Sequence, residues 1–380
     1  MTRVVELFQR FDWTLLVAVA ALTSIGLVAI YGIGVSQEPA SLFTFYKQMT
    51  AAALGLGCVG ALVLVDYRHL RAFSLLLYVL GALLLLGVLF FGQEVRATQG
   101  WYRIGSLSFQ PVELAKLTLV GYLAAFFAGR AHGNLSWRAF LQSGLAAGVY
   151  AFLVLLQPDF GSAMVLLLIW GAMALFAGLP RRAWLILPIV ALVLGGVVWE
   201  VGLKPYQRDR LMAFANPELD PRGSGYNARQ ARIAIGSGGW FGKGIAEGSQ
   251  ARLRFLPEAA TDFIFSVVGE ELGFVGVAIV LGLFLYILYR MLRLGYESED
   301  DFAALLLIGL AAVFLVHLIV NAGMNLGVMP VTGIPMPFLS AAASSLMVAY
   351  VGIGVAESVA ARRRGNPLGI EAGENILSTS

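Results

Sequence analysis

In the stretch LPEAATDFIFSVVGEELGF, residues 256–274, three acidic side chains follow Glu258 and lie in an otherwise apolar run. They are Asp262, Glu270 and Glu271. Ionisable residues inside a membrane helix are costly, and they usually mark a functional site or a paired structural contact. If the helix begins at Asp262, then Asp262, Ser266 and Glu270 share one face, and Glu270 lies about 12 Å deeper at 1.5 Å per residue. We therefore expect Asp262 at the membrane surface and the two glutamates in contacts between helices.

The composition is that of a polytopic membrane protein. Of the 380 residues, 59% are hydrophobic and only 13% are charged, whereas soluble domains have about 25% charged residues. The sequence has no basic block interleaved with aromatic residues, so it does not indicate nucleic-acid binding. The single cysteine, Cys58, excludes a disulfide framework, and the three dispersed histidines do not group as zinc ligands. His317, inside a late apolar segment, is predicted to be a packed or hydrogen-bonded core residue.

Hydropathy predicts an all-α fold of ten transmembrane helices, because each crossing needs roughly 20 apolar residues. The predicted spans are 13–34, 46–65, 72–92, 111–129, 139–156, 162–179, 184–203, 262–290, 302–323 and 341–361. Half of the 26 Lys and Arg residues fall in segments that are cytoplasmic if the N-terminus is inside, and the short outer segments hold only three, which predicts an N-in, C-in topology. Residues 1–364 are expected to form one membrane domain with a long extracytoplasmic loop at 204–258, and residues 365–380 a disordered cytoplasmic tail.

Other polar residues gather on the predicted outer side. Glu113 and Lys116 can pair at the start of the fourth span, where Pro111 suits the first helical turn. Asp159 lies in a corner with proline and glycine neighbours, where it can point inward or cap the sixth span. Each residue also fits a purely structural role, as an ion pair, a cap or a contact between helices. Their clustering predicts a polar cavity that opens outward.

The long loop adds cations and glycine-rich turns. Its central basic residues are Arg208, Arg210, Arg222, Arg229, Arg232 and Lys243. The segment GSGGWFGKG at 236–244 lacks the spacing of a P-loop, but it could offer backbone amides to an anion. The alternative is an amphipathic loop that lies on the lipid headgroups. A polar cavity with a carboxylate and nearby cations suits a phosphate-bearing lipid substrate.

At these residues the chain resembles the SEDS family (shape, elongation, division and sporulation) of peptidoglycan glycosyltransferases. The matching stretches are DYRHLRA at 66–72, GWYRIGSLSFQPVELAKL at 100–117, QPDFGSA at 157–163, NPELDPRGSGYNARQARIAIGSGGWFGKG at 216–244, LPEAATDFIFSVVGEELGFVG at 256–276 and NAGMNLGVMPVTGIPMPFLS at 321–340. The segment GKGIAEGSQARLRFLPE is more similar to the elongation branch, RodA, than to the division branch, FtsW. Two parts of the chain depart from the family pattern. One is Ala260, and the other is the run 341–343, where the family usually reads Tyr-Gly-Gly.

The resemblance implies polymerisation of lipid II, an undecaprenyl-pyrophosphoryl disaccharide-pentapeptide, on the outer face of the bacterial cytoplasmic membrane. Asp262 matches the family's essential aspartate. An acceptor hydroxyl is a poor nucleophile until a positioned base takes its proton. Conversion of an α-linked donor into a β-linked glycan is an inversion, for which one base and a direct displacement suffice.

The leaving group is a lipid pyrophosphate, so the reaction calls for cations. Lys116, oriented by Glu113, is the first candidate, and Arg208 and Arg210 are the next. Asp159 would shape the cavity or hold a divalent cation, Mg²⁺ or Mn²⁺, although no cofactor is established by the sequence. The resemblance also implies a class B penicillin-binding transpeptidase as partner.

Two other functions fit parts of the sequence. A protein that flips lipid II across the membrane would use the same polar residues as translocation contacts. The sequence has no evident internal repeat, which many transporters have, and its polar groups are biased outward, so polymerisation is favoured. A non-catalytic scaffold for a transpeptidase leaves Asp262 unexplained.

Overall fold

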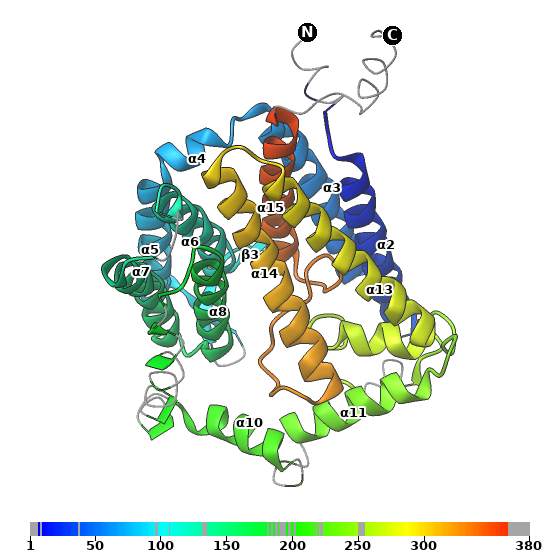
Figure 1. The fold of residues 1–380 in the computed structure, drawn as a ribbon. Helices are drawn as coiled ribbons and strands as arrows, with labels where there is room; N and C mark the ends of the chain where they lie inside the picture. The colour runs from blue at the N-terminus through cyan, green and yellow to red at the C-terminus, as the bar shows by residue number, and fades with distance from the viewer. Residues whose placement is uncertain are drawn as a thin grey trace, which may run out of the picture.

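The protein is a helical bundle, seen here in a computed structural model. The structure describes residues 7, 10–36, 39–95, 98–105, 107–130, 135–180, 182–183, 185–186, 189, 195–196, 199–200, 203–216, 218, 220, 223–249 and 255–363. The long helices are α2 (Trp13–Ser36), α3 (Phe43–Leu64), α5 (Ser74–Phe91), α6 (Pro111–Phe127), α7 (Trp137–Leu155), α8 (Phe160–Phe176), α13 (Ile264–Tyr296), α14 (Asp301–Leu326) and α15 (Ala343–Arg362). A short helix, α4 (Arg68–Ala72), precedes α5. The described chain runs up and down the bundle between these helices (Figure 1).

Seven of the described helices are long and apolar enough to cross a membrane: α2, α3, α5, α7, α13, α14 and α15. The shorter helices α6 and α8 coincide with the predicted spans 111–129 and 162–179. Most of the predicted span 184–203 and all of the predicted tail 365–380 lie outside the described residues. Among the described residues, each remaining predicted span therefore has a helix.

A small antiparallel sheet follows α5 and was not predicted. Strand β1 (Gln93–Val95) pairs with β2 (Thr98–Ile104), which pairs with β3 (Leu107–Phe109). Gly105 has a φ of 61° at the turn between β2 and β3, a conformation that glycine adopts at little cost. The prediction of an all-α chain holds for the bundle, but the polar segment before α6 is a sheet that carries side chains to the site described below.

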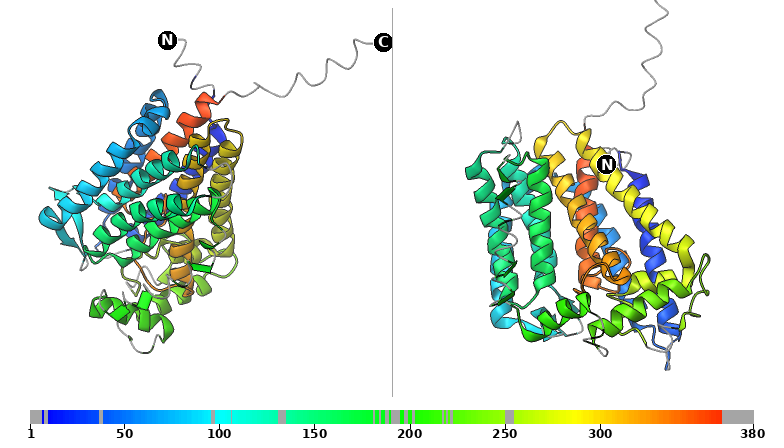
Figure 2. Two further views of the ribbon diagram at one scale, coloured as in Figure 1. Left: turned by 60° about the vertical axis from the view of Figure 1, so that its left-hand side comes forward. Right: turned by 60° about the horizontal axis from the view of Figure 1, so that its bottom comes forward.

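The long loop contains two helices, α10 (Pro205–Ala215) and α11 (Ser224–Ser237). They lie across the end of the bundle that is opposite the start of α2 and the end of α15, as both views of Figure 2 show. Helix α11 packs on α13 and α14. Much of the loop is therefore ordered helix that covers one end of the bundle.

Helix α13 begins at Ile264 and is interrupted at Gly273, which has a φ of 67° and a ψ of −163°. The segment before this kink runs across the end of the bundle, and the segment after it runs along the bundle (Figure 1). Asp262 lies in the turn before the helix. The expectation that Asp262, Ser266 and Glu270 stack on one helical face is therefore wrong, and a depth of 12 Å for Glu270 does not follow from the helical rise.

Candidate functional site

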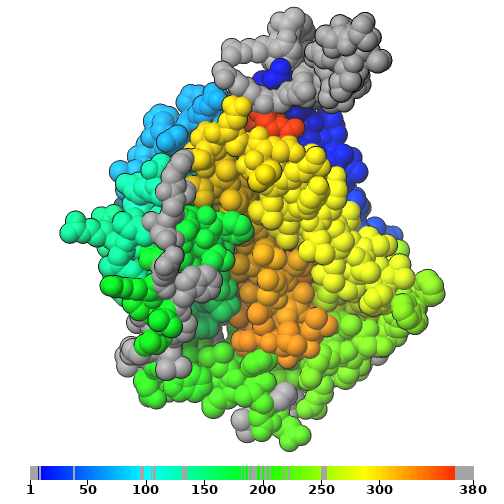
Figure 3. All heavy atoms as spheres, viewed as in Figure 1, coloured from blue at the N-terminus to red at the C-terminus, as the bar shows by residue number. Residues whose placement is uncertain are grey.

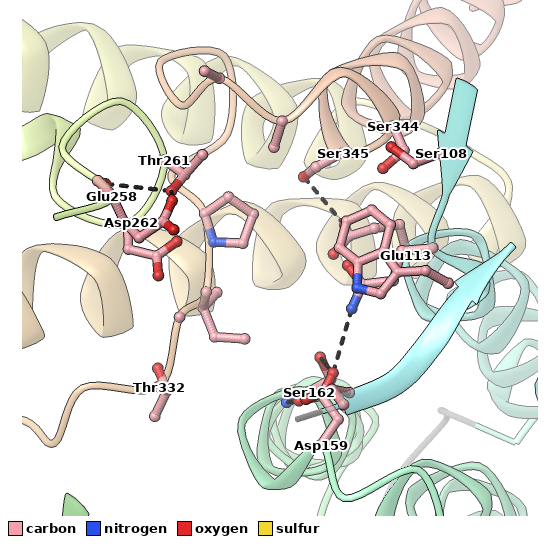
Figure 4. A pocket seen from close by; sticks show the side chains of 18 of the residues that line it. Ser108, Glu113, Asp159, Ser162, Glu258, Thr261, Asp262, Thr332, Ser344 and Ser345 are labelled. Carbon is pink, nitrogen blue, oxygen red and sulfur yellow. Dashed lines mark hydrogen bonds between the residues drawn. The ribbon is translucent and has the colours of Figure 1, made fainter. Parts of the chain in front are cut away.

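A polar cavity of about 670 Å³ lies at the end of the bundle covered by α10 and α11. Its walls come from the β-sheet, the first turns of α6 and α8, the turn before α13, and the segment between α14 and α15. The lining residues that carry charge are Lys47, Arg103, Glu113, Asp159, Arg210, Glu258 and Asp262. In Figure 4, Glu258 and Asp262 lie on one side of the cavity, and Glu113 and Asp159 lie on the other.

The backbone around Asp262 is fixed by α14. Its carbonyl oxygen accepts hydrogen bonds from Asn321 Nδ2 at 3.1 Å and Asn325 Nδ2 at 3.0 Å. The neighbouring Thr261 carbonyl accepts from Ser340 Oγ at 2.6 Å. Because these donors hold the main chain, the carboxylate is presented to the cavity from a rigid turn. Such a turn is the arrangement that a general base needs.

On the opposite wall, Glu113 and Lys116 form the ion pair that their spacing predicted. Lys116 Nζ is 2.8 Å from Glu113 Oε1 and 2.8 Å from His317 Nε2. The other oxygen of Glu113 accepts a hydrogen bond from Ser345 Oγ at 3.2 Å. Glu113 lines the cavity, whereas Lys116 is 1% exposed and lies behind it. Lys116 therefore influences the cavity through Glu113.

His317 is a buried, hydrogen-bonded core residue, as predicted. Its Nε2 meets Lys116, and its Nδ1 lies 3.0 Å from the carbonyl oxygen of Pro335. Lys116 is a donor, so Nε2 is the acceptor and Nδ1 carries the proton. Asn321, one turn further along α14, donates to the carbonyl of Ile334 at 2.8 Å.

The residues His317, Asn321 and Asn325 thus form a polar row on one face of α14, at a spacing of four. This row, which we call the α14 row, holds the lining segment 334–335 and the backbone of Asp262. Through Lys116 it also reaches Glu113. The sequence signal was the polar spacing within an apolar helix, but only His317 was singled out from it.

Asp159 lines the cavity and caps α8, so both predicted placements occur. Its carboxylate accepts hydrogen bonds from the amide of Ser162 at 2.9 Å and from Ser162 Oγ at 2.7 Å. Gln110 Nε2 lies 3.4 Å from Asp159 Oδ2. Desolvation raises the pKa of Asp159 above its ordinary value, although the hydrogen bonds from Ser162 oppose the shift. A nearby cation would favour the ionised form.

The cations of the site differ from those that the sequence ranked highest. Arg210, on α10, lines the cavity. Arg208 is not among the lining residues, and its guanidinium donates to the carbonyl of Glu200 at 2.7 Å. Lys47 and Arg103 do line it. In the predicted topology both lie in short outer segments, but only the sheet and the packing of α3 bring them to the cavity.

Several amides of the glycine-rich segment 236–244 are bonded within the protein. The amides of Lys243 and Gly244 donate to the carbonyls of Glu270 and Glu271 at 2.9 and 3.1 Å. Lys243 Nζ is 2.7 Å from Glu270 Oε1, and the amide of Ala246 donates to Glu271 Oε1 at 3.1 Å. The two glutamates therefore make structural polar contacts, mainly with this loop segment rather than with a neighbouring membrane-spanning helix.

No group of three or more His, Cys, Asp or Glu side chains suited to a metal ion occurs among the residues that the structure describes. The two oxygens of Asp159 already accept hydrogen bonds from Ser162. A divalent cation would therefore need oxygen ligands from the substrate or from water, a common arrangement for Mg²⁺.

The unusual run Ala341–Ala343 also lines the cavity, together with Ser344 and Ser345. The amide of Ala341 donates to the carbonyl of Ala260 at 2.8 Å, next to the turn of Asp262. The departure from the family pattern therefore places three small apolar side chains on a cavity wall.

Comparisons with known proteins identify the family of the chain. The family model FTSW_RODA_SPOVE, described as "Cell cycle protein", matches residues 12–365. The chain is 35% identical to "Probable peptidoglycan glycosyltransferase FtsW" of Trichlorobacter lovleyi, covering 94% of this chain and 95% of that protein. It is 33% identical to "Peptidoglycan glycosyltransferase RodA" of Treponema pallidum, covering 93% and 98%.

Solved structures are similar over nearly the whole chain. One, reported under "Structural coordination of polymerization and crosslinking by a peptidoglycan synthase complex", has a TM-score of 0.79 at 34% identity and covers 94% of this chain and 99% of that one. The crystal structure of Thermus thermophilus RodA has a TM-score of 0.70 at 31% identity and covers 94% and 98%. With its apolar helices, the protein is a multi-pass protein of the bacterial inner membrane. It belongs to the SEDS family of peptidoglycan glycosyltransferases that includes FtsW and RodA.

Proposed function

We propose that this protein polymerises lipid II into β-1,4 glycan strands during cell elongation, by an inverting displacement in which Asp262 is the general base. Asp262 takes the proton of the acceptor hydroxyl as that oxygen attacks the anomeric carbon of the donor sugar. The bond from that carbon to the pyrophosphate breaks, and the lipid pyrophosphate leaves with the electron pair. Because one displacement inverts the anomeric centre, no covalent glycosyl intermediate is needed.

The observation that carries this proposal is the setting of Asp262. Its turn forms part of a cavity wall, and two asparagines fix its backbone. A base contributes typically 10²–10⁴-fold when it is held within reach of the proton it removes. Glu258 also lines this wall, but its carboxylate accepts a hydrogen bond from Thr261 Oγ1 at 3.2 Å. We assign the base role to Asp262, because Asn321 and Asn325 of α14 fix its backbone at the cavity wall.

The leaving pyrophosphate is assigned to the cations on the cavity surface. Arg210, Arg103 and Lys47 line the cavity and can stabilise charge that develops on phosphate oxygens. Lys116 takes a different part, because its ammonium group is held by Glu113 and His317. It positions the Glu113 carboxylate, while Asp159 shapes the same wall. A Mg²⁺ or Mn²⁺ ion, where used, would be held by Asp159 or Glu113 together with substrate phosphates.

The orientation follows from the same proposal. Both termini lie in the cytoplasm, and the cavity opens at the outer face, where the loop 204–258 meets the headgroups. The basic residues near the terminal end, including Arg290, Arg293 and Arg363, agree with the positive-inside rule. Residues 1–364 act as one membrane domain with the tail 365–380 after it. The expected partner is a class B penicillin-binding transpeptidase, which crosslinks the strands.

The test compares purified wild-type protein with Asp262→Asn on lipid II in detergent, and glycan length is measured on a gel. The expected result is polymer from the wild type and a loss of at least about 10²-fold in initial rate for the variant. Glu299→Gln is the matched control, because Glu299 is an exposed acid in the connection between α13 and α14, at the other end of the bundle. It should keep full activity.

Three outcomes separate the alternatives. Undiminished polymer from Asp262→Asn would remove the base role. No polymer from the wild type, with or without the transpeptidase, together with movement of labelled lipid II across vesicle membranes, would indicate a flippase. Neither polymer nor movement, with a stable complex with the transpeptidase, would indicate a scaffold.

A further inference from the structure

Three aromatic side chains gather at the kink of α13, outside the cavity. Trp240, Phe241 and Phe274 are 69%, 83% and 59% exposed. The rings of Trp240 and Phe274 meet edge to face, with centroids 5.1 Å apart. We call these three residues the kink patch. The chain around residues 240–249, lime in Figure 3, lies beside the yellow α13 at the edge of the molecule.

The backbone beneath the kink patch is held rigidly. The amides of Phe274 and Val275 donate to the carbonyls of Gly239 and Trp240 at 2.9 and 3.1 Å. The amides of Lys243 and Gly244 donate back to the kinked helix, and the ion pair between Lys243 and Glu270 lies beside them. A bulky aromatic side chain on such a fixed support stays exposed at a defined place.

Glycine makes this close approach possible. A Cβ at Gly238 would lie 2.0 Å from the carbonyl oxygen of Gly269, and one at Gly242 would lie 2.1 Å from that of Glu271. Gly242 and Gly273 also have positive φ values of 81° and 67°. The local sequence therefore keeps side chains out of the contact and directs the large ones of Trp240 and Phe241 outward.

The length of α13 sets the depth of the kink patch. The segment from Phe274 to Tyr296 follows the kink as the long apolar part of the helix. At 1.5 Å per residue it is about 34 Å long, slightly more than the roughly 30 Å of a bilayer's hydrocarbon core. Arg290 and Arg293 lie near its other end. Phe274 is therefore at the boundary between hydrocarbon and headgroups, the level at which tryptophan is enriched in membrane proteins.

We propose that the kink patch is an interfacial anchor that inserts Trp240 and Phe241 into the lipid headgroup region of one leaflet. The ligand is the lipid surface itself. The anchor has a consequence for the cavity, because the segment it supports is bonded to Glu270 and Glu271 in the first part of α13. That part follows directly on the turn of Asp262. The anchor therefore fixes the height of this turn relative to the lipid headgroups.

The test measures membrane depth and needs no enzymatic activity. The only cysteine, Cys58, is replaced by alanine, and Phe241→Cys is spin-labelled in the full chain. The protein is reconstituted in vesicles of phosphatidylethanolamine and phosphatidylglycerol. Collision with oxygen and with a water-soluble nickel chelate then reports depth. Glu247→Cys is the matched control, because Glu247 is an exposed residue of the same loop segment.

The expected result is a label at position 241 that collides mainly with oxygen, at a depth of about 5–10 Å below the phosphates, and a label at 247 that collides mainly with the nickel chelate. Trp240→Cys provides an independent second site. Nickel accessibility at 240 and 241 equal to that at 247 would overturn the anchor. Shielding from both reagents would also overturn it, since a protein contact would then cover the kink patch.

Discussion

Removal of the buried ammonium group of Lys116 should destabilise the protein strongly. In the Lys116→Met variant, Glu113 loses the ion pair in which Lys116 Nζ lies 2.8 Å from its Oε1. The site is buried, because the Lys116 and Glu113 side chains are 1% and 6% exposed. Breaking a buried pair from one side typically costs about 3–5 kcal/mol, because the remaining charge is uncompensated. Ser345 alone would still donate to Glu113. We therefore expect a loss in this range in the free energy of unfolding.

The double variant Lys116→Met, Glu113→Gln tests the cause. It removes both charges, so most of the lost stability should return, with a coupling energy of about 2–3 kcal/mol. Polymerisation should stay low, since the Glu113 carboxylate on the cavity wall is gone. Unfolding in mixed micelles, followed by tryptophan fluorescence, measures the first quantity, and glycan synthesis from lipid II measures the second.

Lys243→Met is the matched control. Lys243 pairs with Glu270 at 2.7 Å, but its side chain is 31% exposed, and Ser249 also donates to Glu270. Water and this hydroxyl can compensate in part, so the loss should be clearly smaller. The reasoning is refuted if Lys116→Met costs less than about 1 kcal/mol, the value typical of an exposed pair. It is also refuted if the double variant is as unstable as the sum of the single variants.

Three further predictions concern the cavity and the kink. Asn321→Ala leaves the Ile334 carbonyl without its donor, so we expect a loss of about 1–3 kcal/mol in the free energy of unfolding. Initial rates against lipid II should show a fall in kcat that is larger than the change in KM. An unchanged kcat would contradict the role of the α14 row. Arg210→Gln should lower kcat/KM about tenfold, corresponding to 1.4 kcal/mol. Arg208→Gln should change it little, because of these two arginines only Arg210 lines the cavity; equal effects would refute the assignment. Gly242→Ala should cost at least about 2 kcal/mol in thermal or chemical unfolding, because a Cβ would meet the Glu271 carbonyl at 2.1 Å. Gly236→Ala, which has nothing within 4 Å of the new Cβ, should be neutral or stabilising, and the same loss there would contradict the packing argument.

The sequence by itself determined the helical membrane fold, because the length and hydropathy of each apolar run decide whether it can cross a bilayer. It also determined local pairs such as Glu113 with Lys116, since a separation of three residues places them together on any helix. The cap of α8 by Asp159 followed in the same way from neighbouring residues. These features depend on interactions within a few residues of the chain.

Only the tertiary structure decided which residues share the cavity. The turn of Asp262, the sheet with Arg103 and helix α10 with Arg210 are far apart in the sequence, and no periodicity relates them. Tertiary packing also separated the role of Asp262 from that of Glu270 and Glu271. A kink at Gly273 and contacts with a distant glycine-rich segment place Glu270 and Glu271 against the loop, while asparagines of α14 hold Asp262 at the cavity. The physical reason is that hydrogen bonds between distant segments depend on how whole helices pack, which local sequence does not specify.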